Sequence, residues 1–113
     1  KNYKKRFTIK IGQHLKVIDC EEITCFYSEH KATYCYTKSN KNYLMDQSLE
    51  QLEGLLDPMK FFRVNRKFIV QLNSIEDIIS YTNSRLQIKL QHFKESEIIV
   101  SRERVKEFKN WLD

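Results

Sequence analysis

The first half of the chain alternates apolar and polar residues with a period of two, which is typical of β-strands with one buried face. Phe7, Ile9 and Ile11 alternate with Thr8 and Lys10. Residues 23–27 and 33–37 are rich in β-branched and aromatic side chains, which favour strands. The pattern predicts strands at 7–11, 15–18, 23–27, 33–37 and 43–45, with turns at 12–13, 28–31 and 38–42.

After residue 45 the period becomes helical. Ser48 and Gln51 have the spacing of a capping box, and four leucines that follow lie on one face of a helix, namely Leu49, Leu52, Leu55 and Leu56. Asp57–Pro58 ends this helix, because the residue before a proline avoids the helical conformation.

The second half predicts a hairpin, a last strand and a final helix. The hairpin joins strands 75–81 and 85–90 through a turn at 82–84, and the last strand covers 97–100. Ser101 is expected to cap the final helix, whose core face carries Val105, Phe108, Trp111 and Leu112. The expected fold class is therefore mostly β, with one short mid-chain helix and a C-terminal helix.

Composition indicates one domain of 113 residues with a modest core, 41% hydrophobic and 31% charged. Residues 1–6 are interpreted as the remains of a linker and 7–113 as the domain. The chain contains no apolar run near the roughly 20 residues that cross a bilayer, so no membrane is expected as a partner. The three cysteines are odd in number and match no zinc pattern, which favours buried reduced thiols in a cytoplasmic protein.

Enzymatic chemistry has no support in the sequence. The three histidines are scattered, no Ser/His/Asp order or carboxylate pair is visible, and two glycines are too few for a phosphate-binding loop. We therefore expect no catalytic residue, no metal site and no cofactor.

Net charge is +5, and its distribution is uneven. Residues 59–75 hold Lys60, Arg63, Arg66 and Lys67 with no acid, interleaved with apolar residues that would hold these cations on a fold. Residues 42–59 hold four acids and no lysine or arginine. This segregation predicts one positive and one negative face, and a field of that shape steers a polyanion. The alternative for the basic stretch is an ordinary solvated surface strand.

Three ordered motifs resemble the LytTR family of DNA-binding domains. Residues 61–71 read F-F-R-V-N-R-K-F-I-V-Q, residues 99–102 read I-V-S-R, and the leucine-bearing helix reads SLEQLEGLL. The resemblance extends from about Phe7 to Leu112. It implies an elongated, ten-stranded β fold that reads duplex DNA with loops and serves as the C-terminal output domain of a two-component response regulator. Such domains bind direct repeats as dimers, and a receiver or other regulatory domain precedes them.

The chain departs from the family pattern at three positions. Asn65 stands where many members have histidine, Lys67 where many have serine, and Gln71 where asparagine is typical. The first two change hydrogen-bond donors near the expected DNA surface, so the target sequence cannot be transferred. Gln71 replaces an amide that we interpret as structural.

The resemblance places base contacts at Asn65 and Arg66. An arginine can bridge O6 and N7 of guanine, and an asparagine can pair with N6 and N7 of adenine. The alternative for Asn65 is a turn-forming side chain bonded to its own backbone. Arg63 and Lys67 are expected to contact phosphate.

Two further segments complete the predicted site. The tip at 28–33 would bring His30, Lys31 and Thr33 to base edges, although an exposed loop histidine is the alternative for His30. Ser101, Arg102 and Arg104 would hold phosphate, because the start of a helix offers free N–H groups. The alternative there is an ordinary serine cap with solvated arginines.

Two rival functions stay open on the sequence alone. One is a β module for single-stranded nucleic acid or RNA, suggested by the tyrosines. The other is a protein-interaction domain whose basic face meets an acidic partner.

Overall fold

The computed structural model describes residues 2–113, so Lys1, which belongs to the predicted linker, lies outside the described residues. The described chain contains ten β-strands and two α-helices. The strands are β1 (Arg6–Ile11), β2 (His14–Asp19), β3 (Ile23–Glu29), β4 (Ala32–Thr37), β5 (Asn42–Met45), β6 (Phe61–Arg63), β7 (Phe68–Gln71), β8 (Ile75–Tyr81), β9 (Arg85–Leu90) and β10 (Ile98–Val100). The helices are α1 (Leu49–Leu55) and α2 (Val105–Leu112), and short 3₁₀ turns cover Cys20–Glu22, Leu72–Ser74 and Arg102–Arg104.

A central five-stranded sheet has the order β5-β4-β3-β7-β6, with antiparallel neighbours throughout. The hairpin β1–β2 forms a separate sheet, and β10-β9-β8 form a third. Alternate side chains of β3 serve the two faces of the central sheet, because Phe26 joins one buried cluster while Cys25 and Tyr27 join the other.

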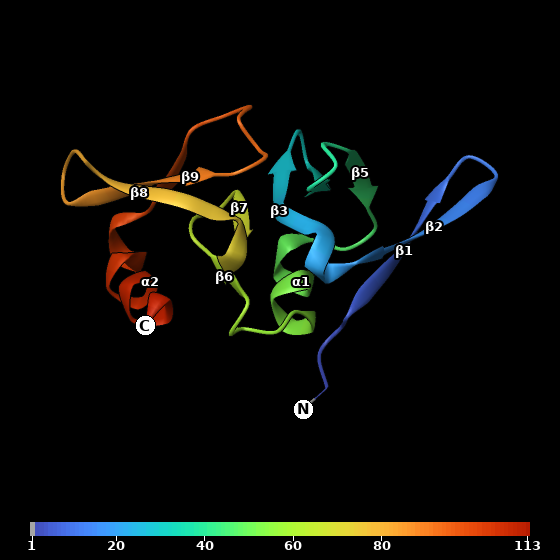
Figure 1. Ribbon diagram of the computed structural model, residues 1–113, viewed down its shortest axis with the longest axis horizontal. Helices are drawn as coiled ribbons and strands as arrows, with labels where there is room; N and C mark the ends of the chain where they lie inside the picture. Colours follow the sequence, from blue (N-terminus) through green and yellow to red (C-terminus); the bar gives the residue numbers. More distant parts are fainter. Residues whose placement is uncertain (1) are drawn as a thin grey trace.

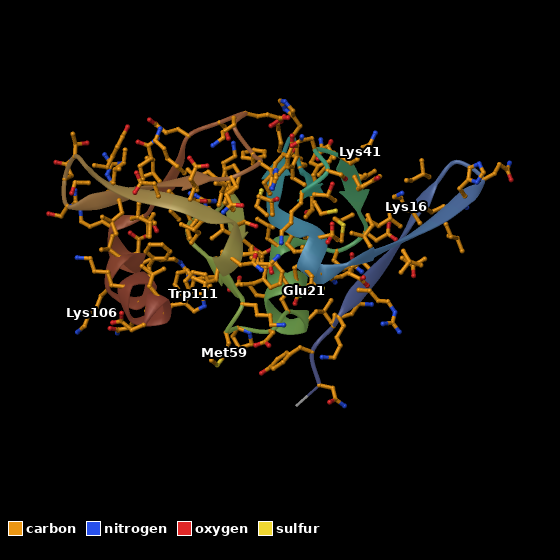
Figure 2. The ribbon with its side chains drawn as sticks, viewed as in Figure 1. Lys16, Glu21, Lys41, Met59, Lys106 and Trp111 are labelled. Carbon is orange, nitrogen blue, oxygen red and sulfur yellow. The ribbon has the colours of Figure 1, made fainter. Side chains whose placement is uncertain are left out.

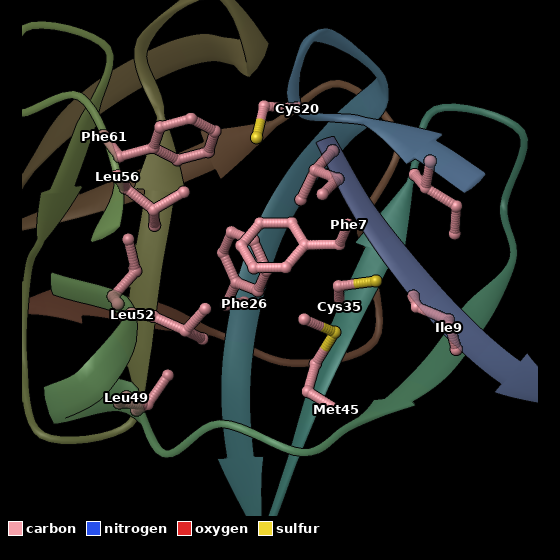
Figure 3. Packing of buried hydrophobic residues seen from close by; sticks show 13 residues of the cluster. Phe7, Ile9, Cys20, Phe26, Cys35, Met45, Leu49, Leu52, Leu56 and Phe61 are labelled. Atoms are coloured by element: carbon pink, nitrogen blue, oxygen red, sulfur yellow. The ribbon is translucent and has the colours of Figure 1, made fainter. Parts of the chain in front are cut away.

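The first cluster lies between the central sheet, the base of the β1–β2 hairpin and α1 (Figure 3). Phe26 is fully buried there, in edge contact with Phe7 at 5.7 Å between ring centroids. Helix α1 starts at the predicted capping box, in which the Ser48 and Gln51 side chains bond each other's backbone N–H groups. Leu49 and Leu52 of this helix are buried in the cluster.

The second cluster lies on the opposite face, under the three-stranded sheet and α2. Phe108 is fully buried in it, and Phe62 packs against both Phe108 and Trp111. The Trp111 indole N–H donates to the Pro58 carbonyl at 2.7 Å, which ties α2 to the segment before β6. Figure 2 shows Trp111 on the inner side of α2 and Lys106 on its outer side.

The sequence predictions of fold class and of most elements are confirmed. The molecule is mostly β with a short mid-chain helix and a C-terminal helix, and its principal extents are 47 × 33 × 24 Å (Figure 1). Phe61 and Phe62 point to different clusters, as expected for neighbours in a strand. No helix within residues 2–113 is long and apolar enough to span a membrane.

The prediction that Ser101 caps the final helix is wrong. A 3₁₀ turn at Arg102–Arg104 intervenes, α2 begins at Val105, and the Ser101 side chain makes no capping bond. Its hydroxyl donates instead to the Val64 carbonyl at 3.4 Å, a tertiary partner that the local sequence does not reveal.

Residues 4–6 belong to the hydrogen-bonded body. The Lys4 N–H donates to the Leu55 carbonyl and the Lys5 carbonyl accepts from the Cys20 N–H, at 2.9 and 2.8 Å. All three cysteines are free and buried, as predicted.

Candidate nucleic-acid interface

The loop between β6 and β7, residues 64–67, is called the reading loop here, and Arg63 holds its base. The Arg63 Nε donates to the Asn65 carbonyl at 3.2 Å and Nη2 to the Arg66 carbonyl at 2.7 Å. Its Nη1 forms ion pairs with Glu50 and Glu53 of α1 at 3.0 and 2.9 Å. The Arg63 side chain is only 12% exposed, so helix, loop and strand are joined by one guanidinium.

Arg63 stays charged in this position. Burial by itself lowers the pKa of a guanidinium, but the two carboxylates outweigh it and raise the pKa of Arg63 above its ordinary value. The four hydrogen bonds to carbonyls and carboxylates give four of the five N–H groups of the Arg63 side chain an acceptor inside the protein.

These ion pairs correct the predicted segregation of charge. The acids of α1 meet Arg63 directly, and Lys60 pairs with Glu21 at 3.1 Å. The expectation of one positive and one negative face is therefore wrong where β6 meets α1, because folding brings the acidic and basic segments together. Lys60, Arg66 and Lys67 of the basic stretch are exposed, and of these Arg66 and Lys67 have no ion pair within residues 2–113.

The Asn65 side chain is bonded into the reading loop. Its Oδ1 accepts from the backbone N–H groups of Lys67 and Phe68 at 2.8 and 2.9 Å. Its Nδ2 donates to the Ile99 carbonyl of β10 at 2.7 Å. This is the turn-forming arrangement given above as the alternative for Asn65, and it leaves one amide N–H for a ligand.

The β3–β4 hairpin ends in a two-residue turn at His30–Lys31, called the tip, between the paired residues Glu29 and Ala32. Both turn residues are left-handed, with φ of 51° and 66°. A type I′ turn needs this conformation and normally takes asparagine or glycine. The backbone of the tip is therefore strained, and its two polar side chains are exposed. Thr33, half-buried, pairs with Ser28 one step down the hairpin.

The tip lies beside the reading loop. The Ser28 N–H donates to the Lys67 carbonyl at 2.9 Å, which extends the pairing of β3 with β7 beyond Phe68. Below them, Tyr27 stacks on Tyr34 and Phe68, with ring centroids 5.4 and 5.8 Å apart. Burial raises the pKa of Tyr27 to about 12, consistent with a role in packing. Tyr36 is buried as well, so these rings support the surface from within.

The segment 101–104, called the junction, packs against the other side of the reading loop. The Ser101 N–H donates to the Val64 carbonyl at 3.1 Å, and the Arg104 Nη1 donates to the Arg63 carbonyl at 3.2 Å. Arg102 is exposed, and its Nε donates to the Asn83 carbonyl at 3.2 Å. The structure thus joins the three predicted segments, with the reading loop between the tip and the junction.

Three residues and one turn that the sequence did not single out for the site also belong to its surroundings. Glu50 and Glu53 hold Arg63, and their spacing of three on α1 was a signal that they share a face. Arg85 and the 82–84 turn adjoin the junction through Arg102, and no local pattern foretells that contact.

Two of the hollows on the described surface bear on the site. The smaller, about 90 Å³, is bordered by Lys67, Glu29 and Glu95, so carboxylates limit where a phosphate could approach the tip. The larger, about 950 Å³, lies between residues 2–6 and β6 and mixes cations with acids, including the Lys60–Glu21 pair. Its mixed charge makes it a poor site for a polyanion.

Residues 13–113 match the LytTR family model, described as the LytTr DNA-binding domain. The chain is 32% identical over 107 residues to the transcriptional regulatory protein YpdB of Escherichia coli, covering 93% of this chain and 43% of that protein. It is 25% identical over 97 residues to the sensory transduction protein LytT of Oceanobacillus iheyensis, covering 86% of this chain and 39% of that protein. It therefore spans about two fifths of these relatives.

A solved structure has the same fold. It is described as the LytTr DNA-binding domain of a methyl-accepting/DNA response regulator from Bacillus cereus, and it superposes with a TM-score of 0.85. The superposition covers 96% of this chain and 97% of that one at 24% identity.

Proposed function

Because this chain belongs to the LytTR family of DNA-binding domains, we propose that it binds duplex DNA sequence-specifically through the reading loop, the tip and the junction. One observation carries the proposal. Segments more than 30 residues apart in the sequence are hydrogen-bonded into neighbours, through Ser28 to Lys67 and through Asn65 to Ile99. They expose Lys31, Arg66, Lys67 and Arg102, for which no ion pair occurs within the described residues.

Each residue takes a role that its contacts permit. Arg66 is exposed and its side chain has no partner within residues 2–113, so its whole fork is available for a guanine edge. Asn65 keeps one N–H for a base, and His30, Lys31 and Thr33 reach base edges from the tip. Lys67, Arg102 and Arg104 contact phosphate. We leave Ser101 out of the phosphate contacts that the sequence predicted for it, because its hydroxyl and its N–H both donate to the Val64 carbonyl. We assign Arg63 to positioning instead of phosphate contact, because its donors already serve the loop and α1.

In the whole protein this domain would be the output module of a bacterial transcriptional regulator working in the cytoplasm. The regulatory names of the relatives, and the additional length they have, support a preceding receiver or other regulatory domain. Binding to direct repeats as a homodimer belongs to the same proposal. The family is a DNA-binding one and not an enzyme family.

Selection from a random duplex pool tests this function. We expect an enriched motif, and binding that falls with salt by about 0.9 log units per log unit of salt for each phosphate contacted. Single strands of the same sequence should compete poorly, since Tyr27 and Tyr36 are buried and cannot stack on bases. Preference for single strands would favour the single-strand module, and failure of any duplex to bind at low salt would favour the protein-interaction domain.

Replacement of Arg66 by alanine tests the base contact. We expect a loss of about 1–3 kcal/mol on the selected duplex and relaxed preference at one base pair. Lys41→Gln is the matched control, because Lys41 is an exposed cation in the turn at the far end of β4 from the tip. An Arg66→Ala variant equally weak on every sequence would reassign Arg66 to the DNA backbone.

A further inference from the structure

The turn between β8 and β9, residues 82–84, anchors two arginines from different elements. The Arg85 Nε donates to the Thr82 carbonyl at 3.1 Å, and its Nη2 donates to the Thr82 hydroxyl at 3.1 Å. The Arg102 Nε donates to the neighbouring Asn83 carbonyl at 3.2 Å. Asn83 and Ser84 are left-handed, with φ of 59° and 60°, so the turn is a sharp, defined support for both side chains.

Both guanidiniums keep donors free. Neither has an ion pair within residues 2–113, and the Nη groups of Arg102 and the Nη1 of Arg85 have no acceptor there. The Arg85 guanidinium also lies 5.0 Å from the centre of the Tyr81 ring, which restricts its motion. Guanidinium groups fixed in this way lose little entropy when they bind an oxyanion.

Two acids adjoin this turn, Glu97 through Tyr81 and Glu103 along the chain. Glu97 accepts a hydrogen bond from the Tyr81 hydroxyl at 3.3 Å, and Glu103 follows Arg102 in the 3₁₀ turn. Neither carboxylate forms an ion pair within the described residues, so two positive charges at this turn stay uncompensated.

The location links this turn to the proposed interface. Arg102 belongs to the junction, whose Ser101 is bonded to Val64 of the reading loop. The 82–84 turn therefore lies next to the junction, just as the junction lies next to the reading loop and the reading loop next to the tip. Figure 1 places the β8–β9 turn at one end of the long axis and the β1–β2 hairpin at the other.

We propose that the 82–84 turn, with Arg85 and Arg102, is a fourth contact that grips a backbone phosphate at the outer edge of the DNA site. This inference rests on the proposed function and adds Arg85 and the turn to it. The ligand is a phosphate diester of the duplex, so the contact adds affinity and length of footprint without selecting a base.

Arg85→Gln tests this contact on the duplex selected by the wild-type protein. We expect the salt dependence to flatten by about one phosphate contact, and hydroxyl-radical protection to disappear at one end of the site only. Lys89→Gln is the matched control, since Lys89 is an exposed cation on the same strand. Identical slopes and footprints for the two variants would overturn the proposal.

A second pair of variants serves if Arg85→Gln fails to fold. Ser84→Asp places a negative charge on the exposed turn in a conformation that aspartate tolerates, and Ser84→Asn is its neutral counterpart. We expect Ser84→Asp to bind several-fold more weakly than Ser84→Asn at low salt, with the difference shrinking at high salt. Equal binding would overturn the inference. If the wild-type protein bound no duplex, the proposed function itself would fail; if Arg66→Ala weakened binding while the turn variants did not, only the fourth contact would fail.

Discussion

Replacing Asn65 by alanine removes three hydrogen bonds that hold the reading loop. Two run from the backbone N–H groups of Lys67 and Phe68 to Oδ1, and the third from Nδ2 to the Ile99 carbonyl. Each such bond contributes about 0.5–1.5 kcal/mol net to stability. Water can replace the exposed bond to Lys67, whereas the other two are partly buried. We therefore expect the free energy of unfolding to fall by about 2 kcal/mol.

Asn65→Asp separates the two functions of the side chain. The carboxylate still accepts from the Lys67 and Phe68 N–H groups, but it cannot donate to the Ile99 carbonyl and repels it. We expect about half the destabilisation of the alanine variant, roughly 1 kcal/mol. The added negative charge should weaken binding to every DNA sequence at low salt.

Urea denaturation of both variants measures the stability change, and binding to the selected duplex and its single-base variants measures the effect on recognition. If Asn65 only organises the loop, Asn65→Ala should lower affinity on all sequences alike. If its remaining N–H also reads a base, preference at one position should relax. A stability for Asn65→Ala within about 0.5 kcal/mol of wild type would refute the reasoning, because changes of that size are usual for surface substitutions without structural contacts.

Two further predictions concern the buried polar and titratable groups. The Gln71 side chain is buried, with 1% of the residue exposed, and its amide donates to the Cys20 and Ile23 carbonyls. Gln71→Leu should therefore cost about 1–3 kcal/mol in urea denaturation, because the Ile23 carbonyl loses this donor while the Cys20 carbonyl keeps the Ile23 N–H. Gln71→Asn, with a shorter amide side chain, should cost less, and equal losses would contradict this reasoning. Burial raises the pKa of the Cys35 thiol from 9.0 to about 12, so the unfolded chain releases this proton at lower pH than the folded one. Stability should therefore fall as pH rises above about 9, by up to about 1.4 kcal/mol per pH unit for this thiol, and Cys35→Ala should show a shallower fall; parallel pH profiles would count against it.

Local sequence patterns were sufficient to predict most of the secondary structure. Alternation at Phe7, Ile9 and Ile11 marked β1, and the capping box at Ser48 and Gln51 marked the start of α1. Both signals depend on interactions between residues that are only a few positions apart, so they can be recognised from the order of the residues. The 82–84 turn, set between two strands, was predicted for the same reason.

Long-range partners were beyond those patterns. The local sequence around Ser101 is typical of a helix cap. Its hydroxyl and its N–H nevertheless both donate to the carbonyl of Val64, which is 37 residues away in the sequence. In the sequence, the cations of the basic stretch 59–75 could not be told apart, but in the fold they have different surroundings. Arg63 became an internal link to Glu50 and Glu53, while Arg66 stayed exposed.

The sequence by itself determined most strands and helices, their apolar faces and the candidate residues for DNA contact, because these follow from short-range periodicity and chemical type. Only the tertiary structure decided which of those residues remain available. Asn65 bonds to Ile99 and Arg104 to Arg63 across 34 and 41 residues of chain, and such pairings arise when two packed cores bring distant backbones together. Hydrogen-bond donors used inside the fold are lost to a ligand, so the same cation can support the interface or form it according to its neighbours in space.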